Sequence, residues 1–202
     1  MRWTVLPWRR AVAAAALVPL LAVGGCVADE PEDVPTTSVS TSSPTHTPSP
    51  SPTADLTTLP ERPAAMEQPT TDGAIAAATY VLELYGYTFA TADAAPWRSI
   101  TLDTCEFCTG VETAVTEMVE AGRTSSGSSV TVVSAKATEI SDDRWFSVDM
   151  EIVQSASERY DSEGNVVGRG VGGPHRAVFA LSWSEGWRVD EMGVEPIEAD
   201  AS

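Results

Sequence analysis

A segment rich in Pro, Ser and Thr between Val27 and Pro60 most strongly limits how this chain can fold. Its central part, TTSVSTSSPTHTPSPSPTADLTTLP, offers almost no apolar side chains to bury, and its prolines interrupt any helix. We therefore expect a disordered, partly extended tether over residues 26–60. This leaves residues 61–198 for one compact domain, a length that can bury its own core.

The first 25 residues read as an export signal. Three arginines and no acid precede an apolar core of 13 residues, Ala11–Val23, which is shorter than the ~17–25 residues that span a bilayer. Arg9 and Arg10 leave open whether export uses the general secretory or the twin-arginine route.

The signal ends in Val23-Gly24-Gly25-Cys26, which resembles the lipobox of bacterial lipoproteins. That resemblance implies diacylglycerol on the Cys26 thiol, cleavage before this residue and a palmitoylated chain anchored to the extracytoplasmic face of the cell membrane. The alternative is an ordinary secretory signal in which Cys26 has no special role.

The charge of the mature chain argues against nucleic acid as a partner. Three of the 12 basic residues and none of the 29 acidic residues lie in the signal, which leaves a net charge of −20 with Lys136 as the only lysine. Nucleic-acid binding needs clustered lysines and arginines to displace counterions. Anionic headgroups would also repel this surface, so the lipid at Cys26 is the expected membrane contact.

Two helices are expected in the first half of the domain. The second begins near Asp103, with Glu106 three residues later as in a capping box, and ends at Gly122. Its apolar stripe comprises Cys108, Val111, Val115 and Met118. The first helix covers residues 71–93, with Asp72 as the expected N-cap and an apolar stripe at steps of three and four, Ile75, Ala78, Leu82, Tyr85 and Phe89.

The second half predicts antiparallel strands. Residues 128–140 are rich in β-branched side chains, residues 161–165 form a turn, and residues 175–196 form two strands joined at 184–186. The glycine-rich run 168–173 is expected to be a flexible loop between strands. Residues 144–156 alternate, with one face made of Phe146, Val148, Met150 and Ile152.

Helices followed by a curved antiparallel sheet predict an α+β domain with the helices on one face. The order of elements, ending in YDSEGNVV and GWRVDEMGVEP, resembles the NTF2-like (cystatin-like) superfamily of cone-shaped domains. Residues from about Pro60 to Gly127, including C-E-F-C, resemble a family of actinobacterial lipoprotein domains of unknown function. The resemblance implies secretion, anchoring and a cone, and it supplies no catalytic residues.

Cys105 and Cys108 form a C-x-x-C pair that can be a disulfide, a redox site or half of a metal site. In an oxidising compartment a structural disulfide is the favoured interpretation. Glu106 and Asp103 place negative charge beside any thiolate, which opposes a redox role. Metal binding would need further ligands, and the only histidines are His46 and His175, so we expect no metal and no cofactor.

NTF2-like cones often hold a pocket between helices and sheet, and some are isomerases or cyclases. Such chemistry needs an acid or base that faces the pocket. The last strand can face inward with Trp187 and Val189 or with Arg188 and Asp190, and a buried Asp190 would support an enzyme. The residues expected to line a pocket are Tyr85, Phe89, Phe146, Val148, Met150, Phe179 and Trp183.

The sequence thus predicts a lipid-anchored extracytoplasmic protein with a non-catalytic domain that binds an envelope protein or a small ligand. Two alternatives stay open, a small-molecule enzyme of the isomerase or cyclase type and a thiol-disulfide protein that uses Cys105 and Cys108.

Overall fold

The computed structural model describes residues 55–198. The expected signal, the lipidation of Cys26 and most of the tether lie outside the described residues. The helical elements are η1 (Ala64–Glu67), α1 (Thr71–Thr91), α2 (Ala95–Arg98) and α3 (Glu106–Glu120). Seven strands follow: β1 (Thr124–Gly127), β2 (Val130–Ser141), β3 (Trp145–Gln154), β4 (Ser157–Tyr160), β5 (Val166–Gly170), β6 (Gly173–Trp183) and β7 (Trp187–Pro196). Within this range, no helix is long and apolar enough to cross a bilayer.

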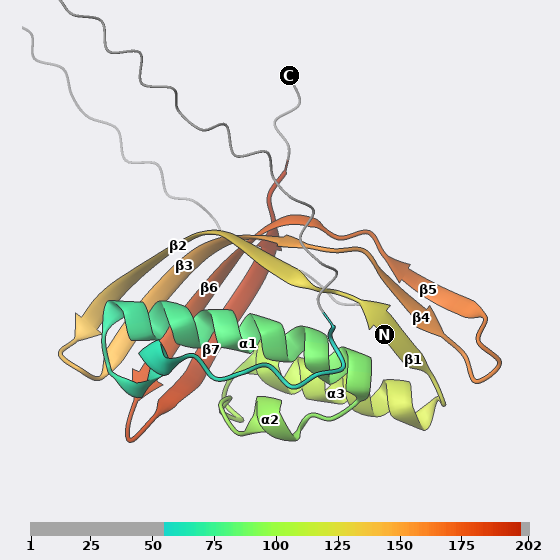
Figure 1. Cartoon of the computed structure of the whole chain (residues 1–202), viewed down its shortest axis with the longest axis horizontal. Coiled ribbons are helices and arrows are strands. Elements are labelled where there is room, and N and C mark those ends of the chain that lie inside the picture. The colour runs from blue at the N-terminus through green and yellow to red at the C-terminus, as the bar shows by residue number, and fades with distance from the viewer. Residues whose placement is uncertain (1–54, 199–202) are drawn as a thin grey trace, which may run out of the picture. The chain divides into compact units, whose positions relative to one another are not determined.

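The strands form a four-stranded sheet in the order β2-β3-β6-β7 and a three-stranded sheet in the order β1-β4-β5. All the pairings within these sheets are antiparallel. The four-stranded sheet curves over α1 and α3, while β4 and β5 reach beyond the helices (Figure 1). The predicted order of helices first and antiparallel sheet afterwards is confirmed.

Glycines occupy the bends at which strands pass from one sheet to the other. Gly127 and Gly172 both have positive φ, at 81° and 70°. A Cβ at Gly127 would lie 2.2 Å from the Ala156 carbonyl oxygen, and one at Gly172 would lie 2.5 Å from that of Gln154. Only glycine allows this close approach. The prediction of a flexible loop over 168–173 is therefore wrong, because this run contains the end of β5, a tight bend and the start of β6.

Helix α1 buries a wider face than its sequence stripe predicts. Ala74, Ala77, Val81 and Leu84 are fully buried, whereas Ile75, Tyr85 and Phe89 pack only partly against the core. The N-cap is Thr70, whose hydroxyl oxygen accepts a hydrogen bond from the Gly73 amide at 3.0 Å. The prediction of Asp72 is wrong because this residue already lies in the first turn, where a negative charge favours the helix dipole.

The predicted alternation of β3 is confirmed, since the side chains of Phe146, Val148, Met150 and Ile152 are at most 3% exposed. On β6, Ala177, Phe179 and Leu181 complete the same layer. On β7, Trp187 and Val189 face inward. A register shift opposite Ala180 and Leu181 then changes the phase, so that Met192 is the next buried residue of β7.

The domain begins before Glu61, the predicted boundary. Leu56 is half-buried, and a Cβ at Gly86 of α1 would lie 3.0 Å from its Cδ2 atom. Leu59, three residues later, is 50% exposed. The last residues of the predicted tether therefore contribute to packing against α1.

We expect Leu56→Ala to lower the free energy of unfolding by roughly 1 kcal/mol, because about half a leucine side chain loses its apolar contact. Thermal unfolding should show a midpoint lower by a few degrees. Leu59→Ala is the matched control and should leave the midpoint unchanged. Equal midpoints for the two variants would mean that the segment before Glu61 does not stabilise the domain.

Candidate functional site

Cys105 and Cys108 form a disulfide bond at the start of α3, and neither residue is exposed. Cys105 is the N-cap of α3, and its sulfur accepts a hydrogen bond from the Cys108 amide at 3.2 Å. The predicted start at Asp103 is therefore displaced by two residues, because the disulfide ring occupies the capping position. The predicted stripe of Cys108, Val111, Val115 and Met118 is buried, and Gly122, with φ of 63°, follows the helix as expected.

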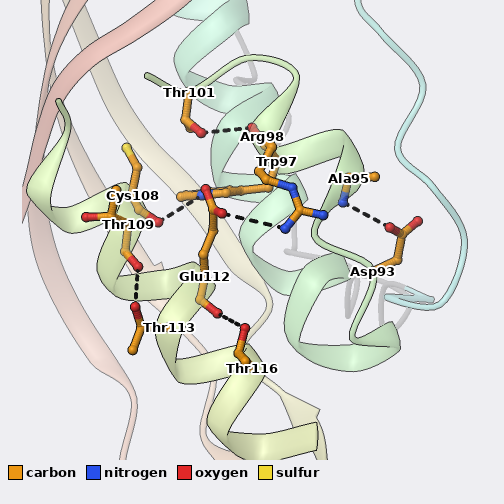
Figure 2. Close-up of polar contacts among 10 residues, drawn as sticks. All are labelled: Asp93, Ala95, Trp97, Arg98, Thr101, Cys108, Thr109, Glu112, Thr113 and Thr116. Carbon is orange, nitrogen blue, oxygen red and sulfur yellow. Dashed lines mark hydrogen bonds and ion pairs between the residues drawn. The ribbon is translucent and has the colours of Figure 1, made fainter. Parts of the chain in front are cut away.

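Helix α2 holds α3 in place through two side chains (Figure 2). The Trp97 indole donates a hydrogen bond of 3.2 Å to the Cys108 carbonyl oxygen, and Trp97 is completely buried. One turn further along α3, Glu112 pairs with Arg98 at 3.6 Å. The buried hydrogen bond fixes the first turn of α3, and the half-exposed ion pair adds little stability by comparison.

The segment between α2 and α3 also pairs with the edge of the sheet. The Val189 amide donates to the Ile100 carbonyl oxygen at 2.8 Å, and the Leu102 amide donates to the Val189 carbonyl oxygen at 3.1 Å. Thr101 and Val189 thus form a parallel bridge. The start of α3 is consequently fixed against β7 as well as against α2.

A cavity of about 240 Å³, termed the inner cavity, lies between the helices and one end of the four-stranded sheet. Ile152 and His175 are paired neighbours on β3 and β6, and Gln154 follows on β3. Among the described residues, none that lines this cavity carries a carboxylate. Its lining consists of Leu82, Tyr85, Phe107, Val130, Ile152, Gln154, His175, Met192, Val194 and Pro196.

His175 is the only imidazole in this cavity, and one of its nitrogens already has a partner. Its Nδ1 lies 2.9 Å from the Gly173 carbonyl oxygen, which can only accept, so Nδ1 carries the hydrogen. In the neutral ring, Nε2 is then a hydrogen-bond acceptor. Besides His175, the lining residues with polar side-chain groups are Gln154, with its amide, and Tyr85, with its hydroxyl. An apolar cavity with a few polar groups suits a small, mostly apolar molecule.

A second, more open hollow, termed the outer groove, lies on the far side of Phe107 and measures about 610 Å³. The residues that line it come from α1, α3 and β7, and two of them, Glu106 and Glu191, are acidic. They are Tyr85, Phe89, Glu106, Phe107, Gly110, Val111, Ala114, Glu191 and Met192.

Two of the residues predicted to line a pocket lie at these hollows. Tyr85 lines both hollows and Phe89 lines the outer groove. Trp183 packs against Trp187, with ring centroids 5.2 Å apart, at the other end of β6 from His175. The remaining predicted residues are at most 2% exposed and form closed core, where side chains from helices and sheet fill the space: Phe146, Val148, Met150 and Phe179.

The sequence contained a signal for His175 that the prediction did not use. His175 lies two residues before Ala177 and four before Phe179, so it shares the helix-facing side of β6. Ile152 was assigned correctly to that side but not to the cavity. Phe107 could not be found in this way, because its placement depends on the position of the first turn of α3.

The carboxylates of the sheet do not reach the inner cavity. Asp149 faces away from the helices and pairs with Arg176, whose guanidinium hydrogen bonds lower the pKa of that carboxyl below its usual value. Asp190 lies at the register shift of β7, and its Oδ2 atom is buried with no hydrogen-bond partner among the described residues. It lines neither the inner cavity nor the outer groove.

A third hollow of about 430 Å³ lies between α1 and the segment that includes Leu56. Its lining includes three acidic residues, Asp55, Glu61 and Glu83. Burial raises the pKa of the Glu83 carboxyl. Because the chain's own N-terminal segment forms one wall of this hollow, we do not assign it a ligand.

The model of a protein family matches residues 51–192 of this chain. The chain belongs to DUF6318, a family of unknown function. The DUF6318 match covers the disulfide, the inner cavity and the outer groove, apart from the end of β7. It confirms the predicted membership of a family of unknown function. Among curated proteins, none matches this DUF6318 chain.

Two solved structures are similar to the described domain. The crystal structure of the intermembrane space region of chloroplast protein ARC6 is 12% identical, covers 63% of this chain and 98% of its own, and has a TM-score of 0.50. An uncharacterised protein with a cystatin-like fold from Caulobacter vibrioides is also 12% identical, covers 64% and 93%, and has a TM-score of 0.41. At such low identity the likeness to the first structure concerns the fold alone. The predicted α+β fold class is confirmed.

We expect the double variant Cys105→Ala, Cys108→Ala to lose about 2 kcal/mol of unfolding free energy, because the small disulfide ring no longer restrains the unfolded chain. Urea denaturation measures this loss, and Thr104→Ala, at an exposed neighbouring position, is the control. Residues 27–202, which lack Cys26, should also resist thiol labelling until the protein is both unfolded and reduced. Labelling of the folded, unreduced protein would contradict a buried structural disulfide.

Proposed function

We propose that this protein is a lipid-anchored extracytoplasmic binding protein whose domain holds a small, largely apolar molecule in the inner cavity. The observation that carries this proposal is the cavity of about 240 Å³ with an apolar lining and a fixed acceptor at His175. The cavity lies where helices and sheet diverge, and the described residues that line it include no carboxylate, lysine or arginine. A neutral molecule can enter it without leaving a carboxylate desolvated.

The location is supported by the sequence. A basic start, a short apolar core and the lipobox-like Val23–Cys26 favour export followed by lipidation of Cys26. A C-x-x-C pair closed as a disulfide is consistent with an oxidising compartment. The actinobacterial lipoprotein family to which residues 60–127 are similar would have the same location.

A binding role accounts for the chemistry better than either alternative. Thiol exchange needs an accessible sulfur, and neither Cys105 nor Cys108 is exposed. Catalysis in the inner cavity would depend on His175 as the base. An isomerase would incorporate deuterium from the solvent into a bound molecule. Loss of this incorporation in His175→Ala, with binding retained, would favour the isomerase alternative.

Binding can be measured with 1-aminoanthracene, an apolar probe whose fluorescence rises in an apolar site, and with residues 27–202. This range retains all of the described residues, 55–198. We expect Val194→Phe to reduce probe binding at least tenfold, because the larger ring fills the inner cavity that Val194 lines.

Val153→Phe is the matched control, because Val153 is 43% exposed on the opposite side of the sheet. It should bind the probe as the unchanged protein does. Absence of probe binding in the unchanged protein, or equal binding by both variants, would contradict a binding role for the inner cavity.

For the anchor, we expect Cys26→Ser to abolish metabolic labelling with a palmitate analogue, because the thiol is the only nucleophile that the lipobox offers. The protein should then leave the membrane fraction or accumulate as precursor. Cys105→Ala with Cys108→Ala is the control and should keep the label. Unchanged labelling of Cys26→Ser would contradict the anchor.

A further inference from the structure

The inner cavity and the outer groove share part of their walls. Three residues line both hollows: Tyr85 of α1, Phe107 of α3 and Met192 of β7. The ring centroids of Tyr85 and Phe107 lie 6.5 Å apart. Side chains change rotamer far more readily than backbone moves, and methionine is the most adaptable apolar side chain. A molecule in the inner cavity can therefore extend into the outer groove past these three residues.

Phe107 has this position because of the disulfide. It lies between Cys105 and Cys108 in the sequence and is half-buried, while both cysteines are fully buried. The hydrogen bond from Trp97 to the Cys108 carbonyl oxygen fixes the same turn of α3. The backbone at Phe107 is thus held rigidly, and its ring is left to form the movable part of the wall.

The two hollows differ in polarity, which indicates how a ligand would lie. His175 and Gln154 line one end of the inner cavity, and with Nδ1 bonded to Gly173 the neutral His175 ring has Nε2 as its acceptor. The outer groove offers apolar side chains, with Glu106 and Glu191 as its only charged residues. These carboxylates would repel an anionic end group. The described lining of the inner cavity has no carboxylate to pair with a buried cation, so the ligand group held there is uncharged and carries one hydrogen-bond donor. The rest of the ligand is apolar.

We propose that the inner cavity and the outer groove form one site for an elongated, uncharged molecule with a single hydroxyl end, as in a long-chain alcohol. The hydroxyl donates to Nε2 of His175, and the apolar chain passes Phe107 into the outer groove. This assignment rests on the proposed binding function and specifies its ligand class. The two hollows together have the size of ordinary small-molecule sites, ~300–1,000 Å³.

The test is a calorimetric titration of residues 27–202 with straight-chain 1-alkanols from hexanol to undecanol. Each methylene that leaves water should tighten binding roughly fourfold, the equivalent of ~0.8 kcal/mol. The gain should continue through the longest alcohols, because their chains extend into the outer groove. The methyl ether of the same chain length should bind about tenfold more weakly, since it cannot donate to His175.

The variant Gly110→Leu tests the contribution of the outer groove separately from that of the inner cavity. Gly110 lines this groove, and a Cβ there would meet no atom within 4 Å, so a larger side chain projects into open space. Leucine also suits the helix interior better than glycine, so the variant should fold. We expect it to bind hexanol normally and to lose the gain for the longer alcohols. Thr113→Leu, which adds a leucine to α3 at a position that lines neither hollow, should behave as the unchanged protein.

The outcomes separate this inference from the proposed function. The two-hollow site would be overturned if the gain in affinity stopped at a short alcohol in the unchanged protein. It would also be overturned if the gain continued to the longest alcohols in Gly110→Leu. In either case the inner cavity would remain a binding site. Binding of 1-aminoanthracene without binding of any alcohol would overturn the ligand class. Binding of neither would contradict the proposed function itself.

Discussion

The pairing of residues 100–102 with Val189 is the contact on which the helical half of the domain depends. Two backbone hydrogen bonds attach this segment to the edge of β7, immediately before α3 begins. The disulfide then sets where the first turn of α3 forms, and the Trp97 indole holds that turn from the other side. Three independent interactions thus fix one turn of helix. Such over-determination is expected where a short helix start must hold a side chain, here Phe107, at the wall of a cavity.

The curvature of the sheet has a comparably local cause. Three strands run from one sheet into the other, and two residues separate the halves at each bend. Gly127 and Gly172 allow neighbouring backbones to approach more closely than any side chain would permit. The bends therefore carry the sheet away from the helices at the end where Gln154 and His175 lie. The inner cavity is the space left at this end, whereas at the other end Trp187 and Phe146, with ring centroids 5.0 Å apart, close the core.

The sequence predicted the elements that repeat regularly and missed the features that depend on a single contact. Alternation in β3 and the stripe of α3 were correct, because each follows from burial of one face. The burial of α1 was predicted too narrowly, because its alanines allow the helix to approach the sheet over a wide face. The phase of β7 changes at Asp190 through a register shift that no alternation pattern reveals.

Most of the residues predicted to line a pocket lie in closed core instead, for a related reason. Phe146, Val148, Met150 and Phe179 are apolar and face the helices, which are the properties of core and of pocket alike. A closed core differs from a pocket in whether side chains of the helices reach the sheet, and this depends on the curvature of the sheet. The chain has a formal net charge of −17, yet no described residue that lines the inner cavity carries a carboxylate. Curvature and register produce this exception together. The acidic side chains remain outside it because β3 turns Asp149 to the opposite face and the shift in β7 leaves Glu191 at the outer groove. The same alternation that builds the core therefore also keeps the carboxylates of these strands out of the inner cavity.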